Sequence, residues 1–563
     1  MRHPFLDLAA KSPDGPDGPF ALAQARTRLS QGSDSLQLQL LPRCKELQFD
    51  DRSIQPAKEG ESRGPRTTPS PRPGWRPRRL SADTVPMERS TPLHRRTVLV
   101  QSLLAAGAVS AQASEPLAAT ALRIENVTRL YPVEVARVVT PRSTDEVKAA
   151  LASWPGAVAV GGGRFSMGGQ VAVRGGLHVD MRQLSGLVWL RPEAGAVRVQ
   201  AGMRWRDLQD LLDPQGLAVR IMQSYSNFTV GGSVSVNCHG RYVGLGPVGH
   251  SIRALQLVTA TGDVLEVGPQ SRPELFSAAI GGYGAVGVIT EVELDLAPNV
   301  RIQRRVTPVP LRDYAEHFRR FVLTDPTAVL HNADLLPPDF AEPVCVTWHR
   351  VGDDVALTEP ERLVPRGRSY ALEQNVIFAM TELPGGARLR ERVVHPLLMR
   401  PQVVKWLNHE ASLDVAELEP RTRAVSTYVL QEYFIPESNF LGFAQEMARL
   451  LRRRNVEALN VSIRHSPRDR VSALPWAPED VFSFVLYYKQ RTWPRARAEV
   501  GAWTRELIAL ALRHGGRYYL PYQLHATVEQ FNAAYPEADR LRRIKQQVDP
   551  AGKLSNELWR KYL

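Results

Sequence analysis

Cysteine is nearly absent from this sequence, since its 563 residues contain only Cys44, Cys238 and Cys345. Their spacing matches no zinc-binding or CxxC pattern, and three cysteines cannot form a disulfide framework. We therefore predict no metal site and no fold that depends on disulfide bonds. Cys238 lies in a glycine-rich segment, where we expect a small packing residue. A redox or cofactor-linking role is the alternative.

A clustered basic stripe is also missing. The chain holds 71 Lys+Arg against 58 Asp+Glu, a formal net charge of +13. No run of basic residues is interleaved with aromatic ones, whereas a nucleic-acid-binding surface concentrates its charge. We expect a solvated basic surface and no nucleic acid partner.

The N-terminal part has few apolar residues. Residues 11–86 are rich in Pro, Gly, Ser, Arg and Gln, and such a segment buries too little apolar surface to offset the entropy of ordering. We predict that residues 1–86 are disordered, or that they are a misassigned upstream extension with Met87 as the true start.

Residues 87–113 have a different composition. Arg95 and Arg96 precede a short apolar stretch, residues 97–109, and Ala-Gln-Ala follows at 111–113. This order is typical of a twin-arginine export signal with its cleavage site. We expect an exported, periplasmic protein whose mature chain has no integral membrane segment, because the apolar stretch is too short to span a bilayer. A short buried helix is the alternative.

The segment "VGGGRFSMGGQ", residues 160–170, has five glycines in eleven positions. A dinucleotide-binding fingerprint requires a helix directly after its glycines. Here the apolar residues continue with a period of two, which predicts strands. No Gly-Lys-Ser/Thr follows, so a Walker A loop is excluded as well. Main-chain N–H groups in such a glycine turn can still form an anion site without a helix.

Two further glycine-rich segments follow within about 130 residues. They are "NFTVGGSVSVNCHGRYVGLGPVGH", residues 227–250, and "IGGYGAVGVITEVELDL", residues 280–296. Each glycine-rich segment lies at the end of a predicted strand.

Together these segments resemble the FAD-binding domain of the vanillyl-alcohol oxidase superfamily, also called the PCMH-type flavoproteins. The similarity extends over about residues 124–298, including "VVTPRSTDEVKAAL", "VDMRQLSGL", "VRVQAGMRWRDLQDLL" and "LVTATGDVLEV". The C-terminal "EQFNAAYPEADRLRRIKQQVDPAGKLSNELWRKYL" resembles the last segment of aldonolactone, sugar-alcohol and decaprenylphosphoryl-ribose oxidases.

The resemblance implies an α+β fold with a two-part, PCMH-type FAD-binding domain and an α/β cap domain that holds the substrate. Residues 120–298 would form the first part of the FAD-binding domain and residues 299–504 the cap. Residues 505–563 would complete the FAD-binding domain.

The resemblance also implies how FAD is held. The loop from Gly161 to Gln170 would wrap the pyrophosphate, the segment from Val230 to Gly240 would line the flavin, and the segment from Gly287 to Ile289 would contact the ribityl or adenine part. The predicted cofactor-binding residues are Gly161, Gly162, Gly163, Arg164, Phe165, Ser166, Met167, Gly169, Gln170, Val230, Gly231, Gly232, Ser235, Asn237, His239, Gly240, Gly287, Val288 and Ile289.

Phe165 occupies the position at which many relatives carry a flavin-linking histidine. Relatives with a second link use a cysteine at the position of Asn227 or Phe228. A phenyl ring has no nucleophilic atom, so we predict non-covalent FAD. We also expect Arg164 to assist the phosphates if its side chain turns inward.

The cap and the C-terminal segment together give four candidate catalytic residues. "NVSIRHS" resembles a Glu-x-Arg segment of sugar-alcohol oxidases, with Arg464 matching the arginine and Ser462 replacing the glutamate. "QEYFIP" presents two strand faces, and we favour the face of Tyr433 over that of Glu432. Tyr522 stands where decaprenylphosphoryl-ribose oxidases have a lysine. His525 is a candidate base, with a structural role as the alternative.

The predicted function is an FAD-dependent oxidase or dehydrogenase acting on a CH–OH group. The substrate would be a sugar-like alcohol, a polyol or an aldonolactone, with hydride transfer to flavin N5. The electron acceptor is oxygen or another molecule. The alternatives are cytokinin-dehydrogenase-like oxidation of a C–N bond, and a flavin-binding protein without turnover.

Overall fold

The computed structural model describes residues 122–386, 403–420 and 422–563. The predictions for residues 1–86 and 87–113 therefore concern segments outside the described residues. No helix in the described ranges is long and apolar enough to cross a membrane.

The first glycine-rich loop follows a strand of a small parallel sheet with the order β3-β5-β4. Its strands are β3 (Arg137–Val139), β4 (Val158–Gly161) and β5 (Leu177–Asp180). Helix α1 (Thr144–Ser153) precedes β4; the Ser143 side chain caps it by accepting a hydrogen bond from the Glu146 N–H. After β4 the chain passes through the loop to β5 with no helix between them, as the period of two predicts.

An antiparallel sheet of six strands carries the rest of the FAD-binding part. Its order is β10-β9-β11-β7-β6, and β8 also pairs with β11. The strands are β6 (Leu187–Arg191), β7 (Ala196–Gln200), β8 (Leu217–Val219), β9 (Ile252–Val258), β10 (Val264–Val267) and β11 (Val288–Pro298). Two helices near the glycine segments are α2 (Trp205–Leu212) and α3 (Val230–Ser235).

A further, larger sheet has eight antiparallel strands in the order β15-β12-β14-β13-β17-β18-β16-β19. Its strands are β12 (Arg301–Pro308), β13 (Ala328–Leu335), β14 (Val344–Arg350), β15 (Val404–Trp406), β16 (Ser426–Pro436), β17 (Ala458–Ser466), β18 (Val481–Arg491) and β19 (Arg517–Tyr518). The first of these strands in the sequence, β12, begins at Arg301, just after β11 ends at Pro298 and close to the predicted start of the cap at residue 299. The chain is thus α+β, with separate sheets for the two parts.

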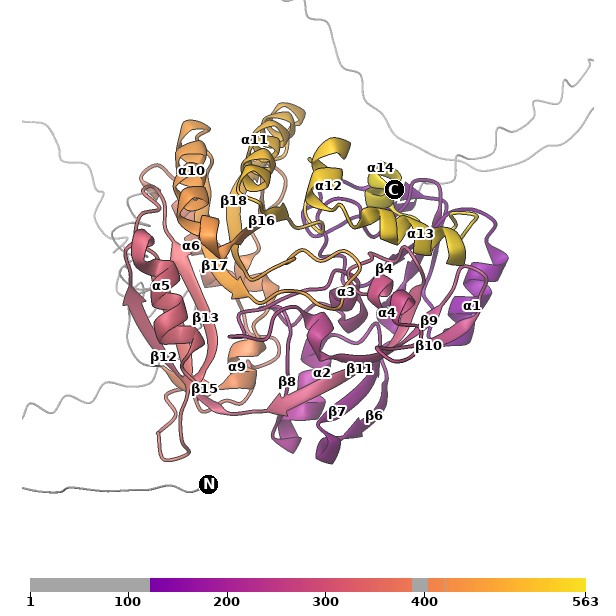
Figure 1. Cartoon of the computed structure of the whole chain (residues 1–563), viewed down its shortest axis with the longest axis horizontal. Helices are drawn as coiled ribbons and strands as arrows, with labels where there is room; N and C mark the ends of the chain where they lie inside the picture. Colours follow the sequence, from indigo (N-terminus) through magenta and orange to yellow (C-terminus); the bar gives the residue numbers. More distant parts are fainter. Residues whose placement is uncertain (1–121, 387–402, 421) are drawn as a thin grey trace, which may run out of the picture. The chain divides into compact units, whose positions relative to one another are not determined.

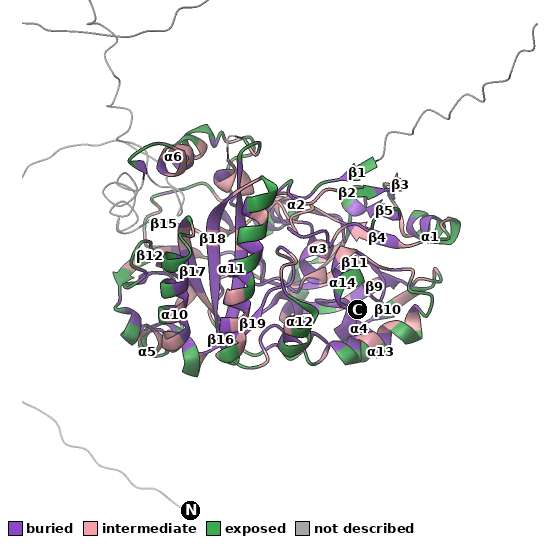
Figure 2. Cartoon of the chain, turned by 90° about the horizontal axis from the view of Figure 1, so that it is seen from above, coloured by how far each residue is buried: buried purple, intermediate pink, exposed green. Residues whose placement is uncertain are grey.

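Helices α10 (Phe440–Arg453) and α11 (Pro494–Arg513) pack beside each other against β16 and β18 (Figure 1). The sequence repeats apolar residues at helical spacing at Phe440, Phe443, Met447 and Leu451, which predicts one apolar stripe on a helix, and in α10 this stripe is buried. Figure 2 shows buried strands beneath α11, which has exposed residues along it. Both faces of β16 are covered, since ten of its eleven residues are buried.

The C-terminal segment returns to the FAD-binding part. The Val158 N–H donates to the Lys553 carbonyl at 2.7 Å, and the Ser555 N–H donates to the Val158 carbonyl at 2.9 Å. Helix α13 (Ala538–Val548) packs on α4 (Pro273–Ala279). The predicted boundary between the cap and the C-terminal segment, at residue 504, falls inside α11. After it, β19 still pairs with β16 of the cap sheet.

Candidate functional site

A pocket lies between the first glycine loop, α3 and the cap sheet. It contains about 1440 Å³ of space, part of it open to solvent. Its lining comes from within residues 160–171, 223–239 and 283–289, from Met181 and Ala201, and from the cap residues Leu430, Glu432, Arg464 and Val485 together with 519–522. The pocket therefore joins all three glycine-rich segments to the cap.

Most of the first glycine loop lines this pocket, including Gly162, Gly163, Phe165, Ser166, Met167 and Gln170. Gly161 does not, since it belongs to β4, and a Cβ there would lie 2.5 Å from the His178 ring. Gly169 does not either; it has a φ of +94° and lies against Glu557. A Cβ on Gly162 would lie 2.1 Å from Thr229 Oγ1. Only glycine allows this close approach.

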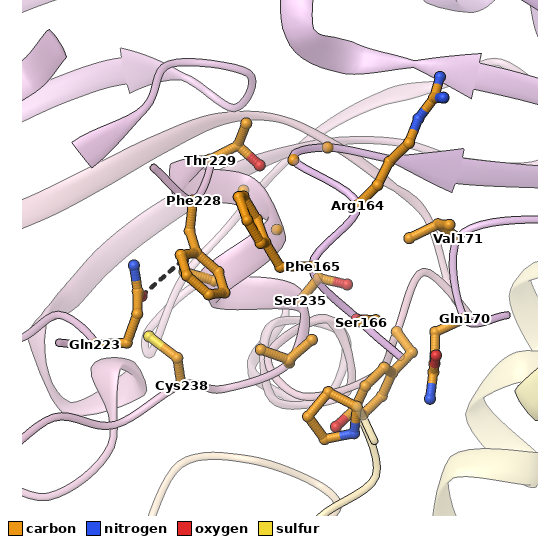
Figure 3. A pocket seen from close by; sticks show the side chains of 18 of the residues that line it. Arg164, Phe165, Ser166, Gln170, Val171, Gln223, Phe228, Thr229, Ser235 and Cys238 are labelled. Carbon is orange, nitrogen blue, oxygen red and sulfur yellow. Dashed lines mark hydrogen bonds between the residues drawn. The ribbon is translucent and has the colours of Figure 1, made fainter. Parts of the chain in front are cut away.

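Arg164 lines the pocket, but its guanidinium group does not turn toward it. Arg164 Nη2 donates to Asp180 Oδ2 at 2.7 Å and to His178 Nε2 at 3.1 Å. Figure 3 shows the side chain directed away from Phe165 and Phe228. Burial, followed by the charge of Arg164, lowers the pKa of His178 to about 4, so this imidazole is neutral and accepts that bond. The condition for Arg164 to assist the phosphates, a side chain turned inward, is therefore not met in this structure.

Phe165 and Phe228 face each other in the pocket (Figure 3). Their ring centroids are 4.2 Å apart and their planes differ by 25°. The Cys238 side chain also lines the pocket, and burial raises the pKa of its thiol to about 12. The thiol is therefore protonated at neutral pH and is a poor nucleophile.

The second glycine segment begins with α3, which the sequence analysis did not predict as a helix. Gly231, Gly232, Ser235 and His239 line the pocket. The other predicted residues do not: Val230 is in the core, Asn237 donates to Asp469 Oδ2 at 2.9 Å, and a Cβ on Gly240 would lie 2.2 Å from the Met222 carbonyl oxygen. In the third segment Gly287 and Ile289 line the pocket, whereas Val288 packs in a separate core cluster.

The cap contributes a polar group around Glu432. His239 Nε2 lies 2.6 Å from Glu432 Oε1, and the Tyr522 hydroxyl donates to Glu432 Oε2 at 3.2 Å. All three residues line the pocket, as does Arg464. His239 comes from the FAD-binding part and Glu432 from the cap, so their contact joins the two.

Glu432 is ionised at neutral pH. Burial acts to raise its pKa, but the charge and hydrogen bond of His239, the charge of Arg464 and the Tyr522 hydroxyl together bring the pKa below its ordinary value. The Tyr522 hydroxyl has a pKa well above its ordinary value because of burial and then the charge of Glu432. A carboxylate base and a phenol donor thus face the same space.

Arg464 is partly exposed, and it lines the pocket. Burial lowers its pKa, although the charge of Glu432 opposes that effect. Its Nε is buried without a hydrogen-bond partner in the described part of the chain. Arg464 is thus placed to donate to an oxygen atom of a bound molecule.

Two predicted catalytic residues lie elsewhere. Tyr433 is on the opposite face of β16 from Glu432; its hydroxyl donates to Gln431 Oε1 at 2.5 Å, and its ring packs near Phe443 of α10. His525 lines a separate surface cleft. Our preference for the Tyr433 face was wrong, and Glu432 is the residue that the sequence analysis passed over.

Comparisons with known proteins agree with this geometry. Residues 135–268 match the family model of an FAD binding domain. An alditol oxidase from a Streptomyces species is 38% identical over 120 residues, 21% of this chain and 28% of that protein. The L-gulonolactone oxidase of Bos taurus is 29% identical over 199 residues, 35% and 45% of the two chains.

A longer similarity covers both parts of the fold. Decaprenylphosphoryl-beta-D-ribose oxidase from Mycolicibacterium smegmatis is 24% identical over 469 residues, 76% of this chain and 92% of that protein. By contrast, the matches to the alditol and L-gulonolactone oxidases span less than half of those proteins. Residues 135–268 are therefore an FAD binding domain, and the chain is a distant relative of the oxidases of the vanillyl-alcohol oxidase, or PCMH-type, superfamily.

Proposed function

We propose that this protein is an FAD-dependent oxidoreductase that oxidises a C–OH group of a sugar-like alcohol, a polyol or an aldonolactone. The observation that carries this proposal is the ionised Glu432, with Tyr522 and Arg464, facing the pocket of the FAD binding domain. The relatives support it, because two of them are named as an alditol oxidase and an L-gulonolactone oxidase.

The pocket suits FAD. Thr229 Oγ1 and Ser224 Oγ line it and are buried with no hydrogen-bond partner among the described residues, so a ligand can satisfy them. Phe165, Phe228, Met181 and Ile289 offer apolar walls for a ring system. Main-chain N–H groups of Gly162 and Gly163 would hold the pyrophosphate. We propose that the attachment is non-covalent, because Phe165 and Phe228 have no nucleophilic atom and the Cys238 thiol is protonated.

The chain's own residues handle the substrate oxygen. Glu432 accepts the hydroxyl proton as general base, and Tyr522 and His239 hold its carboxylate in place. Arg464 donates to the same oxygen and stabilises the negative charge that develops as the proton leaves. The FAD, when bound, supplies the acceptor for the hydride.

A substrate panel tests the proposal. FAD-loaded protein is mixed anaerobically with polyols, aldonolactones and amines, and the loss of flavin colour is followed. Loss with a polyol or lactone supports the proposal. Loss with amines alone favours C–N oxidation, and loss with none favours a flavin-binding protein without turnover. Repeating the active mixture with oxygen and with an artificial acceptor identifies the acceptor class.

We also propose export through a twin-arginine signal, supported by Arg95, Arg96 and the Ala-Gln-Ala of residues 111–113. N-terminal sequencing of the exported protein should begin at Ser114. A mature protein that retains residues 1–86 would contradict this.

A further inference from the structure

His525 lines a second cleft, whereas Tyr522, three residues earlier, lines the FAD pocket. Four cationic side chains line this basic cleft, Arg174, Arg497, Arg560 and Lys561, along with the single carboxylate of Glu557. Leu130, Tyr131 and Leu524 add apolar surface. The cleft thus combines an excess of positive charge with a partly apolar wall.

The one carboxylate of the cleft is already engaged. Glu557 Oε1 accepts from the Arg174 main-chain N–H at 2.8 Å and from Arg560 Nη1 at 3.4 Å. Among the described residues, the Arg174 guanidinium comes no closer to a carboxylate than 4.0 Å, and that carboxylate belongs to Glu134, outside the cleft. Glu557 therefore leaves most of the positive charge uncompensated.

Carbonyl groups position two of the cations without cancelling their charge. Arg497 Nη1 donates to the Leu130 carbonyl at 2.9 Å, and its Nε donates to the Thr492 carbonyl at 2.8 Å. Lys561 Nζ donates to the Leu524 carbonyl at 2.6 Å. These bonds fix the charged side chains before a ligand binds, so binding would cost little side-chain entropy.

Two titrating groups of the cleft have lowered pKa values, chiefly because they are buried and secondly because cations lie nearby. Burial, then Arg505 and Lys561, lower the pKa of His525 to about 4. Burial and Arg505 also lower the pKa of Lys561. An anion in the cleft would oppose both effects, because it favours the protonated forms.

The cleft is distinct from the FAD pocket. A Cβ on Gly168 would lie 2.6 Å from the Tyr522 carbonyl oxygen and 2.8 Å from Leu524 Cγ. Gln170 Nε2 donates to the Tyr522 carbonyl at 2.8 Å. The glycine loop and the segment after Tyr522 therefore form a closed wall between the two.

We propose that the basic cleft is a binding site for a compact multivalent anion, a phosphate ester or a polycarboxylate. Multivalent anions pair with several fixed cations at once, whereas chloride pairs with one. The proposal does not depend on the activity assigned to the FAD pocket.

Calorimetric titration of the FAD-loaded protein with inorganic phosphate, and separately with citrate, tests the site at constant ionic strength set by chloride. Arg560→Gln and Lys561→Gln should each weaken binding roughly fivefold, the size of one partly exposed charge contact. Arg495→Gln is the matched control, since Arg495 is on α11 two residues from Arg497, with an 87% exposed side chain paired with Glu499. It should bind like the wild type.

Phosphate binding without citrate binding indicates a phosphate ester, and the reverse indicates a polycarboxylate. Saturating anion should also raise the pKa of His525, followed through its imidazole C–H resonance and assigned by its loss in His525→Gln. The proposal is overturned if neither anion binds. It is also overturned if Arg495→Gln weakens binding as much as Lys561→Gln does, or if the pKa of His525 does not change. None of these measurements requires turnover.

Discussion

The rings of Phe165 and Phe228 stack with their centroids 4.2 Å apart. In the family that this chain resembles, these two positions lie at or next to the places where flavin-linking residues stand. Here they form an apolar wall that directs no nucleophile at the cofactor.

We predict that denaturation releases the FAD. Wild-type protein precipitated with acid or heat should leave its yellow colour in the supernatant, because pocket contacts alone hold the cofactor. Flavin that stays with the chain through denaturing electrophoresis would show a covalent bond, and Cys238→Ser would then test the nearest thiol.

Gly162→Ala should weaken FAD binding by roughly tenfold, since overpacking a tight contact costs about 1–3 kcal/mol. The added Cβ falls 2.1 Å from Thr229 Oγ1. Removing that oxygen in the double variant with Thr229→Ala should restore part of the affinity, measured by FAD titration of the apoprotein. Equal affinity of Gly162→Ala and wild type would show that the loop adjusts without cost.

We predict that His239 sets the acid limb of the pH profile through its effect on the pKa of Glu432. Because the pKa of Glu432 is lowered in the folded protein, kcat/KM should hold until the pH falls below the ordinary glutamate value of about 4.3. In His239→Gln, less opposes the effect of burial, so the pKa of Glu432 rises. The acid limb should therefore move to higher pH. Glu437→Gln is the control, because Glu437 does not line the pocket. An unmoved limb would remove His239 from this role.

Arg464→Ala should slow flavin reduction by roughly 10²-fold, the usual cost of losing one donor to a developing negative charge. Arg464→Lys should lose less, since it keeps the charge but not the planar donor pair. Both variants should keep their FAD. Loss of FAD with unchanged reduction of the bound fraction would place Arg464 on the cofactor instead.

The sequence pattern was sufficient to predict strands on both sides of the first glycine loop and an apolar stripe on α10, because each depends on local geometry. It could not choose between Glu432 and Tyr433. Strand alternation predicts two faces, but β16 is buried on both, so burial does not mark the face that meets the pocket.

Arg164 and His525 depend on tertiary placement. Arg164 has a φ of 60° and pairs with Asp180 of a neighbouring strand, a contact that no local pattern specifies. His525 is three residues from Tyr522, but the segment between them is irregular. A side chain's direction there follows from packing against α11 and the glycine loop rather than from spacing.

Rapid anaerobic mixing tests whether Glu432 is the base for oxidation of the C–OH group. FAD-loaded wild type and Glu432→Gln are each mixed with the polyol or aldonolactone that reduces the wild type. We predict that the variant keeps its FAD and loses flavin colour roughly 10²-fold or more slowly, as removal of a general base requires. Equal rates in the two proteins would show that Glu432 is not the base.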